Sequence, residues 1–254
     1  MNKNLLKEYI QQLVLSEYKT QFNINYFKNL KTSKERYDYA SSNLKLLGRG
    51  SSRAAFLLPN TKYVLKLALP ARGDEASGIA QNEAEVGMFT TPGVKDIITK
   101  IYDYSPEYFW LISEAVRAIS GSEEFKTKTG FTINELNSFI MSIGDKRVKS
   151  IEEFFDKEKN VINNDIENYE LYKPKYMDKE EEDMFNSSLN KLKDELNYYE
   201  ELSNNKYLVG IDHLLSIGHY PGDLAYSDHW GITVNGNLVL LDYGASNEVI
   251  GKYY

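Results

Sequence analysis

The order of its segments is the feature that most constrains how this chain can fold. A charged segment of helical composition, residues 132–202, lies between short apolar runs rich in β-forming residues. These runs occupy residues 44–47, 54–58, 63–69, 97–102, 108–112, 231–234 and 237–241. Turn-forming Gly, Pro and Asn residues separate most of them, which is typical of antiparallel strands. The Asn-Gly pair at 235–236 predicts a tight hairpin between the last two. We therefore expect an α+β protein with a small antiparallel sheet.

Three further segments complete this outline. Residues 75–89 predict a helix that Pro92 and Gly93 end. Residues 5–14 carry apolar side chains at helical spacing and predict an amphipathic helix, which either packs on the body of the protein or docks on a partner protein. The polar and aromatic stretch at 23–42 has no clear period, and we expect a connection there.

Composition excludes several classes of protein and of site. The 254 residues include no cysteine, which excludes disulfides, thiolate metal sites and a cysteine nucleophile. No apolar run approaches the roughly 20 residues of a membrane span, and charged residues interrupt the start of the chain, so we expect an intracellular protein without a secretory signal. Residues 120–202 hold 20 Asp and Glu against 12 Lys and Arg, which makes duplex DNA or an anionic membrane an improbable partner for that segment.

The first candidate site element is the Gly-rich bend at residues 48–53. Gly48 and Gly50 would let backbone N–H groups approach phosphate oxygens, and Ser51 and Ser52 follow them. The alternative is a plain turn between two strands. The bend is not a Walker-type loop, because no Gly-Lys-Ser/Thr follows and the next element is a strand.

The second element is Lys66, which lies inside the apolar run 63–69. An ammonium group removed from water needs a partner. Glu83 on the predicted helix is the first candidate for this partner and Glu85 the second. The alternative is a structural ion pair, or a lysine that faces solvent.

Two aspartates form the third and fourth elements, one on each side of the predicted hairpin. Asp223 precedes the hairpin and Asp242 follows it, so both should return to the same end of the strands, near Asp228 or His229. Carboxylates gathered in this way suit Mg²⁺, a hard cation that prefers oxygen ligands.

Taken in order, these elements resemble the protein kinase-like superfamily, which includes protein kinases and the aminoglycoside and choline phosphotransferases. The resemblance covers residues 44–118 and 208–246 and includes the Asp-Tyr-Gly triplet at 242–244. It implies a two-lobed kinase-like fold with an antiparallel N-lobe sheet and a reduced, helical C-lobe. The expected borders are 1–43 for the N-terminal helix and connection, 44–118 for the N-lobe and 119–254 for the C-lobe. The Trp-Gly pair at 230–231 is similar to kinase-like proteins of tailed bacteriophages.

The resemblance also implies a role for each site residue. Lys66 would bind the ATP phosphates and pair with Glu83, and Asp223 would act as the catalytic base. Asp242 would bind Mg²⁺ with Asp228, or with His229 in an alternative alignment. The loop residues Gly48, Gly50, Ser51 and Ser52 would also contact the nucleotide, and the backbone from Glu114 to Val116 would hold its adenine edge.

The chain also departs from the family pattern. Arg53 stands where a third glycine is expected, no arginine precedes Asp223, and only ten residues follow Gly244. These departures leave two functions open, an ATP-dependent phosphotransferase and a catalytically inactive pseudokinase. The pseudokinase would act as a binding or structural module, within a virus particle or against a host protein, so the expected location is the host cytoplasm or the virion. A third possibility is that the motifs are coincidental in an acidic helical protein with a small sheet.

Overall fold

The computed structural model describes residues 22–59, 62–70, 75–144, 148–244 and 246–253. The amphipathic helix expected at 5–14 lies outside these residues. The chain divides into two compact units. Unit 1 contains the segment that ends at Ile119 together with Gly218–Asp223 and the segment that begins at Asp228, and unit 2 contains Ser120–Ile217 and Leu224–Ser227. The expected lobe borders at 43/44 and 118/119 stay a prediction.

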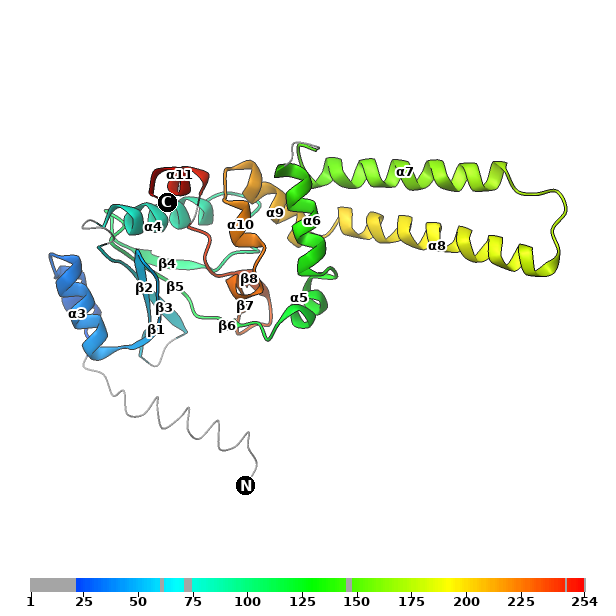
Figure 1. Cartoon of the computed structure of the whole chain (residues 1–254). Coiled ribbons are helices and arrows are strands. Elements are labelled where there is room, and N and C mark those ends of the chain that lie inside the picture. Colours follow the sequence, from blue (N-terminus) through cyan, green and yellow to red (C-terminus); the bar gives the residue numbers. More distant parts are fainter. Residues whose placement is uncertain (1–21, 60–61, 71–74, 145–147, 245, 254) are drawn as a thin grey trace, which may run out of the picture. The chain divides into compact units, whose positions relative to one another are not determined.

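Unit 1 is built on a five-stranded antiparallel sheet (Figure 1). Its order is β1-β2-β3-β5-β4. The strands are β1 (Lys45–Arg49), β2 (Arg53–Leu57), β3 (Tyr63–Ala68), β4 (Ile101–Tyr104) and β5 (Trp110–Glu114). All four neighbouring pairs are antiparallel. The α+β class and the antiparallel sheet expected from the sequence are confirmed.

One face of this sheet is covered by α2 (Ile24–Asn29) and α3 (Ser33–Asn43). Phe27 and Ala40 of these helices pack with Phe56, Leu65 and Leu67 of the strands, and all five are buried. The expectation of a connection at 23–42 is therefore wrong. The helices form because their starts are capped and because a few large side chains, rather than a continuous stripe, fix them to the sheet.

The opposite face of the sheet carries α4 (Ala76–Phe89), the helix predicted at 75–89. Val86 of α4 packs with Leu111 of β5 and Ile101 of β4. Because successive side chains of a strand point to opposite faces, Leu111 faces α4 while its neighbours Trp110 and Ile112 belong to the core on the other side. The sheet is thus a middle layer between α2/α3 and α4.

The predicted hairpin completes a second, three-stranded sheet in unit 1. It consists of β6 (Arg117–Ala118), β7 (Trp230–Ile232) and β8 (Leu238–Leu240). Gly236 takes φ 81°, the conformation for which glycine is favoured in such a turn. Ile98 forms a single bridge with Leu240 rather than part of a strand. Helix α10 (Pro221–Leu224) and the 3₁₀ turn η1 (Ser227–His229) precede the hairpin, and α11 (Asn247–Tyr253), which contacts α4, follows it.

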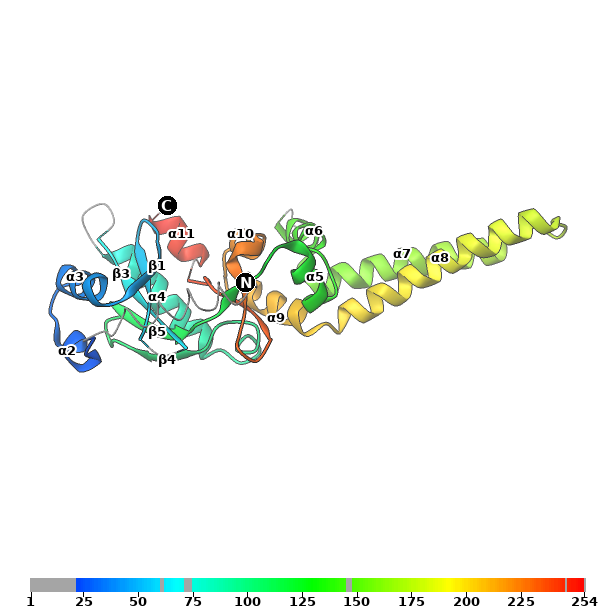
Figure 2. The same ribbon diagram turned by 90° about the horizontal axis from the view of Figure 1, so that it is seen from below.

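Unit 2 is helical, as the sequence predicts for residues 132–202. Its helices are α5 (Ser122–Thr129), α6 (Ile133–Gly144), α7 (Ile151–Leu171), α8 (Lys179–Ser203) and α9 (Lys206–Ser216). Helices α7 and α8 form a long antiparallel hairpin (Figure 2). Its polar outer faces explain why apolar residues are sparse in this segment. In the described ranges, no helix has both the length and the hydropathy needed to cross a membrane.

Candidate functional site

The candidate site in unit 1 begins with the side of the sheet on which Lys66 lies. Leu65 and Leu67 point into the core beneath α2 and α3, so Lys66 between them must point toward α4. Its partners in the two neighbouring strands are Ala55 and Leu111. Alternation along β3 thus places one ammonium group on the α4 side of the sheet.

Lys66 pairs with Glu85 of α4. The ammonium Nζ donates to Oε1 at 2.8 Å and to Oε2 at 2.7 Å of Glu85, and to the carbonyl oxygen of Leu241 at 2.7 Å. The Glu85 side chain is fully buried, and that of Lys66 is 13% exposed. The prediction that Glu83 is the partner is wrong, because Glu83 lies two residues away on the exposed side of the helix and lines a groove with α11 instead.

Arg53 joins this pair and is the residue whose role the sequence did not predict. Its Nη1 donates to Glu85 at 2.6 Å, and its Nη2 donates to the carboxylate of Asp242. A longer contact of 3.4 Å joins Nη1 to Asn82. The Arg53 side chain is only 10% exposed. Two cations and two carboxylates therefore form one cluster, which we call the Arg53 cluster: Arg53, Lys66, Glu85 and Asp242.

The segment that carries Asp242 is anchored on both sides. Leu240 donates to the carbonyl of Ile97 at 2.8 Å, and Leu241 donates to the carbonyl of His229 at 2.8 Å. The hydroxyl of the buried Tyr243 donates to the carbonyl of Thr99 at 2.7 Å. These bonds hold Asp242 beside Arg53.

Two glycines allow the elements around the Arg53 cluster to approach closely. A Cβ atom on Gly78 would lie 2.3 Å from the carbonyl oxygen of Ser52, and one on Gly244 would lie 2.6 Å from the carbonyl oxygen of Gln81. Gly78 lets α4 reach the Gly-rich turn, and Gly244 lets the segment after Asp242 reach α4. The cluster is therefore built by close backbone packing as well as by charge.

The two aspartates of the predicted catalytic pair have opposite pKa shifts. Partial desolvation raises the pKa of Asp242, but Arg53 and Lys66 outweigh it and hold the value well below its usual range. Desolvation, with help from the negative charge of Asp242, raises the pKa of Asp223 to about 6. Asp223 is 20% exposed, and its carbonyl oxygen contacts Nδ1 of His229 at 2.8 Å.

The residues predicted to bind Mg²⁺ do not form a suitable ligand set. Asp242 is already paired with Arg53, and Asp228 is exposed on η1. Among the described residues there is no group of three or more His, Asp or Glu side chains that could hold a metal ion. The pairing of Asp242 with Arg53 therefore disagrees with the divalent cation that the sequence predicts at this carboxylate.

A cavity of about 460 Å³ lies between the Gly-rich turn and the Arg53 cluster. It is lined by residues Gly48, Arg49, Gly50, Ser51, Ser52, Arg53, Ala54, Ala55, Lys66, Gln81, Leu241 and Asp242. The turn residues predicted to contact nucleotide thus all line it, as do Lys66 and Asp242. Ser52 is nevertheless buried, and its hydroxyl accepts from Gln81 at 2.9 Å, so its side chain has a structural role.

The segment from Glu114 to Val116, which the sequence predicts to hold the adenine edge, lies outside the lining of this cavity. The backbone N–H of Glu114 donates to the carbonyl of Lys100 at 2.8 Å, and that of Ala115 donates to the carbonyl of Lys62 at 2.6 Å. Neither Glu114 nor Val116 lines the cavity. Two N–H groups of the segment are therefore already bonded within the protein.

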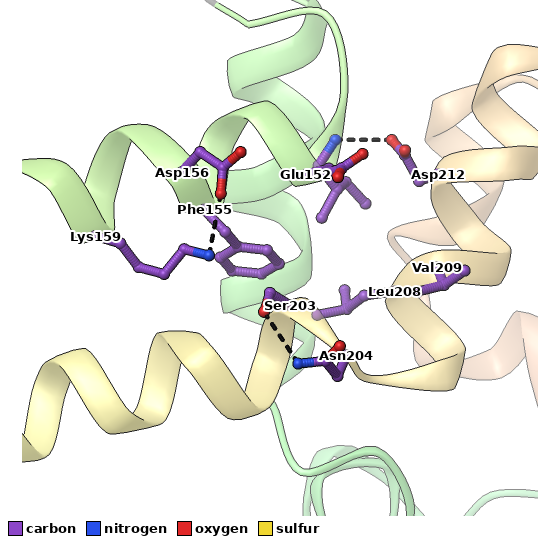
Figure 3. Close-up of a pocket in the computed structure, with 10 residues that line it drawn as sticks. Glu152, Phe155, Asp156, Lys159, Ser203, Asn204, Leu208, Val209 and Asp212 are labelled. Atoms are coloured by element: carbon purple, nitrogen blue, oxygen red, sulfur yellow. Dashed lines mark hydrogen bonds and ion pairs between the residues drawn. The ribbon is translucent and has the colours of Figure 1, made fainter.

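Unit 2 contains a separate cavity of about 370 Å³ where α7, α8 and α9 meet (Figure 3). Phe155 lies in its wall, and Lys159 pairs with Asp156 at 3.0 Å. The carboxylate of Asp212 accepts from the backbone N–H of Ile151 at 2.7 Å and so caps the start of α7. These polar groups bond to one another or to the backbone, which gives them a structural explanation.

Comparison with solved structures finds similarity at a low level. No family model and no curated protein matches the chain. Among solved structures, the ternary complex of streptomycin, ATP and APH(2″)-IIa matches with 14% sequence identity and a TM-score of 0.32. That match covers 85% of this chain and 71% of the other. At this similarity the functional argument depends on the geometry of the Arg53 cluster and its cavity.

Proposed function

We propose that unit 1 is a kinase-like nucleotide-binding module that holds the phosphates of ATP in the cavity beside the Arg53 cluster. The observation that carries this proposal is the charge of the cavity lining. In the described part of the chain, three cationic side chains, Arg49, Arg53 and Lys66, line it with a single carboxylate, that of Asp242. Such a lining favours a polyanion.

Phosphoryl transfer is the catalytic form of this proposal. Asp223 is the candidate base, because a carboxyl group with a pKa of about 6 is ionised at pH 7 yet is a stronger base than an ordinary aspartate. It would accept the proton of the acceptor hydroxyl as that oxygen attacks the γ-phosphorus, while the bond from that phosphorus to the β–γ bridging oxygen breaks and ADP leaves. Lys66 and Arg53 would stabilise the negative charge on the transferred group.

The second candidate is a pseudokinase that binds nucleotide without turnover and acts as a binding or structural module in a virion or on a host protein. The pairing of Arg53 with Asp242 favours it, because the carboxylate expected to hold the catalytic metal is occupied by a guanidinium group. Binding and catalysis are therefore tested separately.

Nucleotide binding is tested by the thermal stability of the protein with ATP and with adenosine. A ligand at a hundred times its Kd stabilises the folded state by about 2.7 kcal/mol, so ATP should raise the unfolding temperature while adenosine at the same concentration should raise it much less. No shift with ATP would contradict the proposal. Turnover is tested by release of phosphate from ATP, with Asp223→Asn as the matched variant. Binding without a rate that depends on Asp223 would favour the pseudokinase.

A further inference from the structure

We infer that this site takes its phosphate ligand as the metal-free anion, with the guanidinium of Arg53 in the role that a divalent cation would otherwise have. The inference rests on the proposed nucleotide binding and adds the form of the ligand. It starts from a disagreement between the residues present and the Mg²⁺ site expected from the sequence.

The first step is the position of the positive charge. Arg53 lies between Glu85 and Asp242 and donates to both. A metal ion at Asp242 would have to displace the guanidinium or share its carboxylate with it. Displacement would leave a cation that is only 10% exposed with Glu85 as its one remaining ionic partner among the described residues, which costs free energy.

The second step is the number of donors. A guanidinium group has five N–H donors, and the bonds of Arg53 to Asn82, Glu85 and Asp242 use three. Arg53 also lines the cavity. It can therefore keep both carboxylates and still donate to a phosphate oxygen, for which its planar fork is well suited.

The third step is the charge balance of the site. Within the Arg53 cluster, Arg53 and Lys66 balance Glu85 and Asp242 without a metal ion. Arg49 adds one further positive charge to the lining of the cavity. The site is thus positive before any metal ion binds, and a metal ion on the ligand would reduce the attraction between ligand and protein.

The inference is tested by measuring the affinity of the full-length protein for ATP in EDTA and in excess MgCl₂. We expect the Kd in EDTA to be equal to or lower than the Kd with Mg²⁺. A Kd at least threefold lower with Mg²⁺ would overturn the inference and would show that Asp242 is released from Arg53 to bind metal. Absence of ATP binding in both buffers would instead refute the proposed function itself.

Arg53→Gln supplies an independent test, because it removes the guanidinium while Lys66 still neutralises Glu85. We expect it to weaken ATP binding in EDTA at least tenfold and to make binding stronger with Mg²⁺ than without, since Asp242 is then free to bind metal. Arg117→Gln is the control. Arg117 is exposed on β6 and does not line the cavity, so we expect less than a threefold effect and no new dependence on Mg²⁺. Equal behaviour of the two variants would contradict the role of Arg53. If Arg53→Gln does not fold, the test is the Kd of the wild-type protein for ATP in EDTA compared with its Kd in MgCl₂.

Discussion

Lys66 and Glu85 form an ion pair at 2.7 Å that joins the middle strand of the sheet to α4. Glu85 also accepts from Arg53, so one fully buried carboxylate serves two cations. Its removal would leave both cations with fewer partners in a site of low exposure.

Glu85→Gln should destabilise unit 1 by about 3 kcal/mol, because breaking a buried ion pair leaves uncompensated charge. The matched control is Glu83→Gln on the exposed side of the same helix, which should change stability by no more than about 0.5 kcal/mol. Urea unfolding followed by tryptophan fluorescence measures both, since Trp110 and Trp230 both lie in unit 1. Equal losses in the two variants would contradict the assigned pairing.

The same helix offers a second pair of matched substitutions. Gly78→Ala should destabilise the protein by about 1–3 kcal/mol, because the new Cβ would lie 2.3 Å from a backbone oxygen. Gly87→Ala should stabilise it by about 0.5–1 kcal/mol, since no described atom lies within 4 Å of the position that the new Cβ would take and alanine favours helix. Gly78→Ala should also weaken ATP binding, as it moves the Gly-rich turn. Urea unfolding should show a lower free energy of unfolding for Gly78→Ala and a higher one for Gly87→Ala than for the wild-type protein.

Titration of Asp223 gives a third prediction. Carbon-13 NMR of the labelled carboxyl should show a pKa near 6, and Asp242→Asn should lower that pKa by removing a nearby negative charge. A folded-state pKa above the unfolded value means that the folded protein loses stability from this group as pH rises from about 4 to 6. Asp223→Asn should therefore stabilise the protein at pH 7.5 and have little effect at pH 4. A pKa close to 4 for Asp223 in the wild-type protein would contradict both the raised pKa and its predicted effect on stability.

His219 should act in the opposite direction. Burial lowers its pKa to about 4, although Asp242 opposes the shift. The folded protein then binds fewer protons than the unfolded chain, so stability from this group is present above about pH 6.5 and is lost as pH falls toward 4. Between pH 7.5 and 4.5 the wild-type protein should lose about 2 kcal/mol of unfolding free energy relative to His219→Phe, which is the contribution of His219. An unchanged pH dependence in that variant would contradict the assignment.

Unit 2 can be tested through two adjacent tyrosines. The hydroxyl of Tyr198 donates to Glu135 at 2.6 Å and so joins α8 to α6. Tyr198→Phe should destabilise unit 2 by about 1.5–3 kcal/mol, the usual value for a hydrogen bond to a charged group. Tyr199→Phe is the control, because its hydroxyl makes no hydrogen bond to the residues that the structure describes. Circular dichroism measures both variants, since unit 2 is helical and holds neither tryptophan.

The sheet and α4 could be predicted because their sequence signals are local. Apolar runs bounded by turn residues indicated the strands, and the Asn-Gly pair indicated the hairpin. The helix α3 was missed although its signal was present. Thr32 and Glu35 form a capping box, which marks the start of a helix even where apolar periodicity is weak.

The partners within the Arg53 cluster were harder to predict because they depend on helix rotation and on contacts between distant segments. Glu83 and Glu85 are chemically equivalent in the sequence, and only the packing of α4 decides which one faces Lys66. Arg53 did carry a usable signal. Its neighbours Ala54 and Phe56 pack in the core under α2 and α3, and alternation then places Arg53 and Ala55 on the α4 side with Lys66. Its bond to Asp242 spans 189 positions and has no local signal.

The division of the chain has a consequence for biosynthesis. Unit 2 is inserted into unit 1, so nearly a hundred residues of helical protein are translated after β5 and before β7. Domains fold as units while the chain emerges from the ribosome. The residues of the five-stranded sheet are therefore made well before Asp242, and until then Glu85 is the only carboxylate of the Arg53 cluster that can pair with Arg53 and Lys66. A nascent chain that stops short of Asp242 would carry one uncompensated positive charge in the Arg53 cluster.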